Sequence, residues 1–139
     1  MPSHLYIIIG AYGSGKSEFS LHLARCFKAQ GKDVVLADLD VVNPYFRSRE
    51  MQEDFMQEGI DVIAPEGKYK HSDLPMISPR VKGAIQNKAK TVILDVGGDP
   101  AGCRALGRFE EPIKTRGYNM LYIVNTMRPF TSTPEEIIS

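Results

Sequence analysis

The segment GAYGSGKS, from Gly10 to Ser17, constrains this chain more than any other part of its sequence. It fits the pattern G-x-x-x-x-G-K-[ST] and lies between an apolar run and a segment of helical period. Glycine at positions 10, 13 and 15 permits positive φ angles and lets backbone N–H groups come close to an anion. A helix that starts here adds the positive end of its dipole. The pattern predicts a loop that binds phosphate groups.

Each residue type in this loop has its own expected role. Lys16 is expected to contact the β- and γ-phosphates of a nucleotide, and Ser17 to offer its hydroxyl to Mg²⁺. The expected nucleotide-binding residues of the loop are Gly10, Gly13, Ser14, Gly15, Lys16 and Ser17. The alternative is a glycine-rich turn that only joins a strand to a helix, and the position of the motif after an apolar run disfavours it.

Short apolar runs alternate with segments of helical period along the chain, which predicts an α/β fold of three layers with a mainly parallel central sheet. The runs are continuously apolar or nearly so, as in strands covered on both faces, and span residues 5–9, 34–37, 60–64, 91–95 and 120–125. Helices are expected after the phosphate loop and over residues 46–58, 78–88 and 101–116. Pro112 is expected to kink or shorten the last of them.

The length of 139 residues is that of a single domain, and 17 Lys and Arg balance 17 Asp and Glu. This balance gives no reason to expect direct binding to nucleic acid or an anionic membrane. The apolar runs are too short to span a bilayer and the N-terminus has no signal-peptide pattern, so a cytoplasmic protein is expected. Cys26 and Cys103 are isolated in sequence and are expected to be reduced, at buried or half-buried positions.

The C-terminal stretch STPEEIIS has the signals of a helix that begins at Ser132 or Thr133. The sequence ends about one turn later. We therefore expect residues 1–139 to form a nucleotide-binding domain that is truncated or lacks its C-terminal elements.

Two groups of acids follow predicted strands. Asp95 ends the fourth apolar run, where a carboxylate can hold Mg²⁺ beside the phosphate loop, and the amide of Gly98 is placed to sense a γ-phosphate. Asp38 and Asp40 follow the second run and lie two residues apart, so both can point to the same side of an extended chain. One of them is expected to complete the Mg²⁺ shell or to position the attacking water. Solvated strand-end acids are the alternative.

Four stretches taken in order resemble the MinD/ParA/CobB-like, or SIMIBI-type, group of P-loop NTPases, which also holds the nitrogenase iron protein and the arsenite-pump ATPase. They are GAYGSGKS, LADLDVVNPYFRSRE, VILDVGGD and YIVNTMRPF, and together they run from Leu5 to about Phe130. The first is specific for nucleotide binding, whereas the other three are specific only in combination. The resemblance implies the P-loop NTPase fold, with ATP and Mg²⁺ as cofactors.

The resemblance also implies roles for single residues. In that group the acid after the second strand supports hydrolysis, which implies Asp40 first and Asp38 second as catalytic residues beside Lys16. The metal-holding aspartate carries over to Asp95, with Ser17 and Asp40 as further metal ligands. The second switch carries over to Gly97, Gly98 and Asp99, and a strand-end asparagine that touches the base carries over to Asn125.

The chain departs from the group at one position. Many members have a second lysine directly after the first glycine of the loop, which reaches the nucleotide of a dimer partner, whereas this chain has Ala11. A homodimer activated in that way is therefore in doubt, and an unidentified protein partner is the other expectation. A cation from Arg47, Arg49 or Arg104 is an alternative source of charge.

Three functions are compatible with these residues. The leading hypothesis is a nucleotide-dependent switch ATPase. GTPases of the Ras type read guanine with an N/T-K-x-D segment, whose aspartate binds the base. The corresponding segment here, NTMRP, has no aspartate at its fourth position, so adenine is favoured over guanine. The second is a small-molecule kinase or an ATP-dependent synthetase of the same fold. The third is a nucleotide-binding module that does not hydrolyse its ligand and serves as a docking platform.

Overall fold

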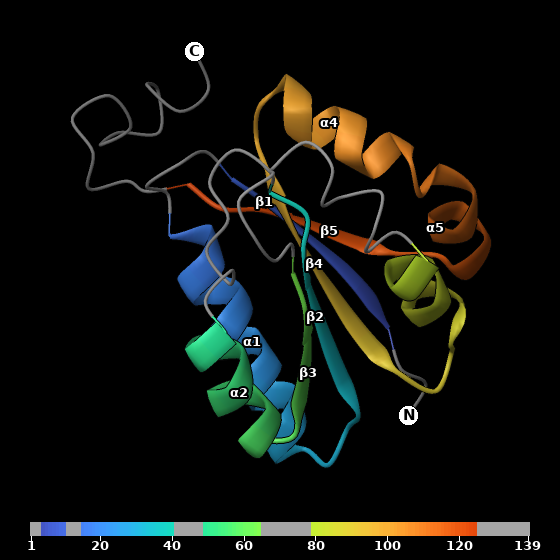
Figure 1. Cartoon of the computed structure of the whole chain (residues 1–139). Coiled ribbons are helices and arrows are strands. Elements are labelled where there is room, and N and C mark those ends of the chain that lie inside the picture. Colours follow the sequence, from blue (N-terminus) through green and yellow to red (C-terminus); the bar gives the residue numbers. More distant parts are fainter. Residues whose placement is uncertain (1–3, 11–14, 41–48, 65–78, 125–139) are drawn as a thin grey trace.

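The computed structural model describes residues 4–10, 15–40, 49–64 and 79–124. They form a five-stranded sheet in the order β3-β2-β4-β1-β5, in which every neighbouring pair is parallel (Figure 1). The strands are β1 (Leu5–Gly10), β2 (Val34–Asp38), β3 (Ile60–Ile63), β4 (Thr91–Gly97) and β5 (Asn119–Tyr122). The α/β fold with a parallel sheet and helices on both faces is confirmed.

Helices α1 (Lys16–Ala29) and α2 (Arg49–Gln57) cover one face of the sheet. The core on this face joins Ala24 and Phe27 of α1 and Phe55 of α2 to side chains from β1, β2, β3 and β4. Phe55 is buried although the helix around it is rich in charge, because it faces the strands. Each helix is followed by a glycine at positive φ, Gly31 and Gly59, a conformation that commonly ends helices.

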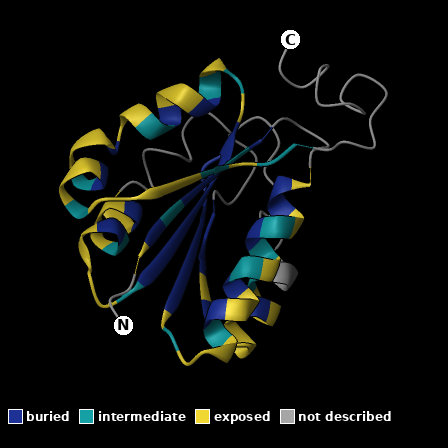
Figure 2. Cartoon of the chain, turned by 180° about the vertical axis from the view of Figure 1, so that it is seen from behind, coloured by how far each residue is buried: buried dark blue, intermediate teal, exposed yellow. Residues whose placement is uncertain are grey.

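The opposite face carries a helix over residues 79–86 together with α4 (Pro100–Gly107) and α5 (Glu110–Arg116) (Figure 1). Its core contains Val81 and Ile85 from the first of these helices and Ile113 from α5, packed on alternate residues of β1, β2 and β4. Strands β2 and β4 are buried along their whole length, and β1 is buried except at Tyr6 and Ile9, so the middle of the sheet is mostly dark blue in Figure 2. Continuous apolar runs are what such doubly covered strands require.

Three expectations need correction. The segment 101–116 is not one helix kinked by Pro112, because α4 ends at Gly107 and a new helix starts at Glu110. The buried Phe109 lies at this junction, and Pro112 lies in the first turn of α5, where its missing N–H costs no hydrogen bond. The fifth apolar run is not covered on both faces, since β5 is the edge of the described sheet and leaves Met120 and Tyr122 exposed.

The third correction concerns the thiols, since Cys26 and Cys103 are both free and exposed rather than buried. Among the described helices none is both long enough and apolar enough to cross a membrane. The predicted helix start at Ser132 or Thr133 lies outside the described residues.

Candidate nucleotide-binding site

The candidate site lies where β1, β4 and β2 end. The register pairs Gly10 of β1 with Gly97 of β4, and Asp38 of β2 with Asp95 of β4. Because these strands are neighbours and parallel, their carboxyl ends meet at the same edge of the sheet. Residues far apart in the sequence are thereby placed beside the start of α1.

The first turn of α1 places Lys16 and Ser17 at this edge. Gly15 caps the helix in the left-handed region, at a φ of 88°, a conformation that side-chain-bearing residues rarely adopt. The Phe19 amide donates to the Gly15 carbonyl at 2.9 Å, and the Ser20 hydroxyl donates to the Lys16 carbonyl at 2.9 Å. Ser20 is fully buried, and sequence reasoning did not single it out. The base of Lys16 is therefore fixed within the helix.

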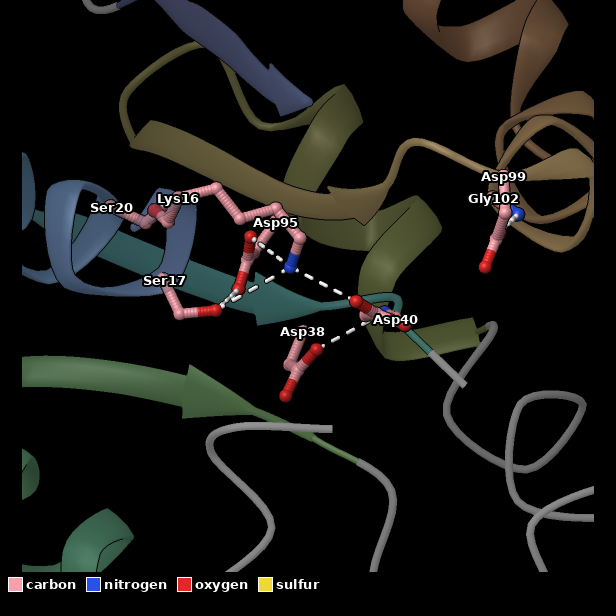
Figure 3. Close-up of polar contacts among 8 residues, drawn as sticks. All are labelled: Lys16, Ser17, Ser20, Asp38, Asp40, Asp95, Asp99 and Gly102. Atoms are coloured by element: carbon pink, nitrogen blue, oxygen red, sulfur yellow. Dashed lines mark hydrogen bonds and ion pairs between the residues drawn. The ribbon is translucent and has the colours of Figure 1, made fainter. Parts of the chain in front are cut away.

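Lys16 extends its ammonium group between two carboxylates (Figure 3). Its Nζ lies 3.0 Å from Oδ2 of Asp40 and 3.1 Å from Oδ1 of Asp95. The three residues are almost completely buried, with exposed fractions of 5% for Lys16, 3% for Asp40 and 0% for Asp95. The structure thus brings together three residues that the sequence predicted to share one site.

Ser17 joins the same group through Asp95. Its hydroxyl donates to Oδ2 of Asp95 at 2.8 Å and accepts a longer hydrogen bond from Lys16 at 3.4 Å. Asp95 is therefore held through both carboxylate oxygens by residues of α1. Hydrogen bonds between buried charged groups are worth more than neutral ones because their loss leaves a desolvated charge unpaired.

Burial and charge act in opposite directions on these groups. Burial alone would lower the pKa of the Lys16 ammonium, but the charges of Asp95 and Asp40 and its hydrogen bonds to them raise that pKa above its ordinary value. Burial raises the pKa of the Asp95 carboxyl, and Lys16 and Ser17 offset only part of this effect. Perturbed groups of this kind are typical of functional sites.

Asp38 and Asp40 do different things in the structure. Oδ1 of Asp38 accepts a hydrogen bond from the backbone amide of Asp40 at 3.1 Å, so Asp38 helps to orient the residue whose carboxylate contacts Lys16 (Figure 3). The catalytic roles expected for Asp40 and Asp38 stay predictions.

The end of β4 is shaped by close backbone contacts. A Cβ atom at Gly97 would lie 3.2–3.3 Å from the carboxylate atoms of Asp40, and one at Gly102 would lie 1.8 Å from the Gly97 carbonyl oxygen. The amide of Gly98, expected to sense a γ-phosphate, donates to the Gly10 carbonyl at 3.1 Å. This bond links the end of β4 to the beginning of the phosphate loop.

Asp99, expected in the second switch, caps α4 in the structure. Its Oδ1 accepts a hydrogen bond from the Gly102 amide at 2.8 Å, and Pro100 occupies the first helical position. The sequence Asp99-Pro100 carries this capping signal, which sequence reasoning overlooked. It also overlooked Gly102, because a glycine required by close packing looks like any other glycine in a sequence.

Several predicted residues lie outside the described part of the chain. They are Ala11, Gly13, Ser14, Arg47 and Asn125. Arg104 is exposed on α4.

The donor atoms at the site fit a magnesium ion. Mg²⁺ prefers oxygen ligands, and Asp40, Asp95 and Ser17 offer two carboxylates and one hydroxyl around a single cationic group. No group of three or more His, Cys, Asp or Glu side chains suited to a metal occurs among the described residues. A metal ion here would therefore also need ligands from a bound phosphate or water, as Mg²⁺ usually does.

A glycine-rich phosphate loop between β1 and α1, on a parallel α/β sheet, defines a P-loop NTPase-type domain. Residues 5–130 match the CobQ/CobB/MinD/ParA nucleotide-binding domain family, and the chain belongs to this family. The resemblance found from the sequence is thereby confirmed. None of the curated proteins matches this chain.

Solved structures of similar fold include two FtsY proteins and a tyrosine kinase domain. The cell division protein FtsY of Thermotoga maritima is 21% identical, with a TM-score of 0.61, and the match covers 99% of this chain but 47% of that one. The signal recognition particle receptor FtsY of Elizabethkingia anophelis, in complex with GDP, is 19% identical with a TM-score of 0.53, covering 81% of this chain and 36% of that one.

A third structure, the BceF tyrosine kinase domain, is 16% identical with a TM-score of 0.54, covering 86% of this chain and 68% of that one. At these identities the likeness establishes the fold. This chain spans less than half the length of both FtsY proteins.

Proposed function

We propose that this domain binds ATP together with Mg²⁺ and acts as a switch-type ATPase. The observation that supports it most is the convergence of Lys16, Asp40 and Asp95 at the start of α1, with Ser17 bonded to Asp95. Membership of a nucleotide-binding family supplies the ligand class.

The chain's own residues supply positioning and charge. Lys16 and the backbone amides of the loop would bind the phosphates and stabilise negative charge on the transferred phosphoryl group. Asp95, Asp40 and Ser17 would hold Mg²⁺, which neutralises charge on the phosphate oxygens. Asp40, whose backbone amide donates to Asp38, would also orient the attacking water molecule.

The choice of adenine rests on the sequence NTMRP, which lacks the carboxylate that reads guanine in Ras-type GTPases. The FtsY structure with bound GDP is a reason to test guanine with equal care. The segments that order around a γ-phosphate are expected to be those that follow β2 and β4.

Calorimetric titration with Mg-ATP and Mg-GTP tests the proposal. We expect the wild-type chain to bind ATP more tightly than GTP, and Lys16→Ala to abolish binding of both. Lys114→Ala is the matched control, because Lys114 is an exposed lysine on α5 paired only with Glu110 in the described structure. ATP binding retained by Lys16→Ala would contradict the assignment.

Phosphate release separates the switch from its alternatives. Free phosphate formed from Mg-ATP without an acceptor supports the switch ATPase. Turnover only in the presence of a carboxylic or amide acceptor supports a kinase or synthetase, and binding without turnover supports a docking module.

A further inference from the structure

The ammonium group of Lys16 already uses its full hydrogen-bonding capacity inside the protein. An ammonium has three N–H donors, and those of Lys16 face Asp40 at 3.0 Å, Asp95 at 3.1 Å and Ser17 at 3.4 Å. A phosphate oxygen can be contacted only if at least one of these partners is given up. The geometry therefore sets a phosphate ligand and an internal partner in competition for one group.

We propose that Asp40 is this internal competitor, a latch that holds Lys16 and that nucleotide phosphate must displace. The inference rests on the proposed function and adds a regulatory role for Asp40 to it. A phosphate close to Lys16 is also close to the Asp40 carboxylate, and the like charges repel each other.

Asp95 is poorly suited to be the partner that leaves. It lies within β4, which is hydrogen-bonded to β1 on one side and to β2 on the other. Its second oxygen is held by Ser17, and it is completely buried. Asp40, in contrast, lies two residues beyond the end of β2 at Asp38. The Leu39 amide still donates to the Asp95 carbonyl at 2.9 Å, whereas the Asp40 amide donates to the side chain of Asp38 and not to β4.

Gly97 provides the surface on which the Asp40 carboxylate rests. All three carboxylate atoms of Asp40 lie 3.2–3.3 Å from the position of a Cβ at this glycine. A methyl group there would press on the carboxylate and push it away from its present position. The latch therefore connects Asp40, just after β2, to Gly97 at the end of β4.

A latch lowers apparent affinity, because only the fraction of molecules with an open latch can bind. The test uses ADP in the presence of EDTA, so that no metal ion contributes, and compares wild type with Asp40→Asn and Gly97→Ala. Asp61→Asn is the matched control, because Asp61 is an exposed acid on β3 and its substitution changes net charge equally. Thermal denaturation of each variant confirms that it is folded.

We expect Asp40→Asn to bind ADP at least fivefold more tightly than wild type, Gly97→Ala to change affinity in the same direction, and Asp61→Asn to match wild type. The kinetics distinguish a latch from the simple removal of a negative charge. In wild type the observed association rate should level off at high ADP, because the latch must open first, whereas in Asp40→Asn it should keep rising linearly.

Unchanged or weaker ADP binding by folded Asp40→Asn, or a rate that rises linearly in wild type as well, would overturn the latch while leaving the proposed function intact. If wild-type protein binds no nucleotide, the proposed function fails and the latch fails with it.

Discussion

Two partly or fully buried cations lie in different parts of this molecule and have different kinds of partner. Lys16, at the start of α1, contacts the carboxylates of Asp40 and Asp95. Arg116, at the end of α5, donates to the backbone carbonyls of Ala84 at 3.3 Å and Ile85 at 3.1 Å, and to that of Lys90. One cation is held by charged side chains, and the other by neutral backbone groups.

The pKa directions follow from this difference. The carboxylates raise the pKa of Lys16 in spite of its burial, whereas burial lowers the pKa of Arg116. Carbonyls of the backbone are fixed by the fold, so Arg116 ties the helix over residues 79–86 to α5 as a structural brace. Carboxylates on side chains can exchange one cation for another, which is what a binding site requires.

The largest effect on stability is expected from Lys16→Met. It leaves two buried carboxylates without their cation, which should lower the free energy of unfolding by about 3 kcal/mol at neutral pH. Urea denaturation at pH 8 and pH 5 checks this. Burial already raises the pKa of Asp95, and the loss of Lys16 would raise it further. Protonation of Asp95 in the variant removes an unpaired buried charge as the pH falls. The loss of unfolding free energy in Lys16→Met should therefore be smaller at pH 5 than at pH 8. A deficit equal at both pH values would contradict this.

Arg116→Met should have a smaller effect, about 2 kcal/mol, because it leaves neutral carbonyl groups without a donor. The same urea experiment should give an equal deficit at pH 5 and pH 8, since no carboxylate is involved. Arg116→Lys is the control, and it should recover only part of the loss because one ammonium cannot replace a planar guanidinium fork. If Arg116→Met instead lost less unfolding free energy at pH 5 than at pH 8, as expected for Lys16→Met, the two cations would not differ in the way described.

Alkaline titration should sharpen the difference further. The Lys16 pKa in the folded protein lies above its ordinary value of 10.5, so its stabilising contribution is complete below pH 10.5 and is lost as the pH rises through the folded value. The difference in unfolding free energy between wild type and Lys16→Met should therefore shrink above pH 10.5. A difference that stays constant would show that the charge of Lys16 contributes nothing.

The smallest effect is expected from Glu110→Gln. This substitution breaks the exposed pair between Glu110 and Lys114, which are 2.7 Å apart on α5. Solvent and salt screen such pairs, so urea denaturation should show a change no larger than that of an ordinary surface substitution. A loss comparable to that of Arg116→Met would mean that surface charge, rather than burial, decides how much a cation contributes.

The sequence predicted the inner strands well because continuous apolar runs have one main use in a sheet covered on both faces. The same signal wrongly predicted that β5 is covered on both faces, because an apolar run does not show whether another strand lies beyond it. The break between α4 and α5 was missed because Phe109 is buried at the junction and therefore fits a helical apolar pattern as well as a helix boundary.

The grouping of Lys16, Asp40 and Asp95 was predictable, because parallel strands bring their carboxyl ends to one edge. The partner of the Gly98 amide and the packing of Gly102 were not predictable. Both depend on distances between backbone segments that are far apart in the sequence, and side-chain patterns do not encode such distances.

Gly102 packs so closely on the Gly97 carbonyl that the beginning of α4 and the end of β4 are in direct backbone contact. A displacement of the end of β4 would therefore be passed directly to α4. Cys103, the next residue along, is exposed. A fluorescent label on the Cys103 thiol, in a Cys26→Ser background, would report movement of α4 that starts at Lys16, Asp40 and Asp95.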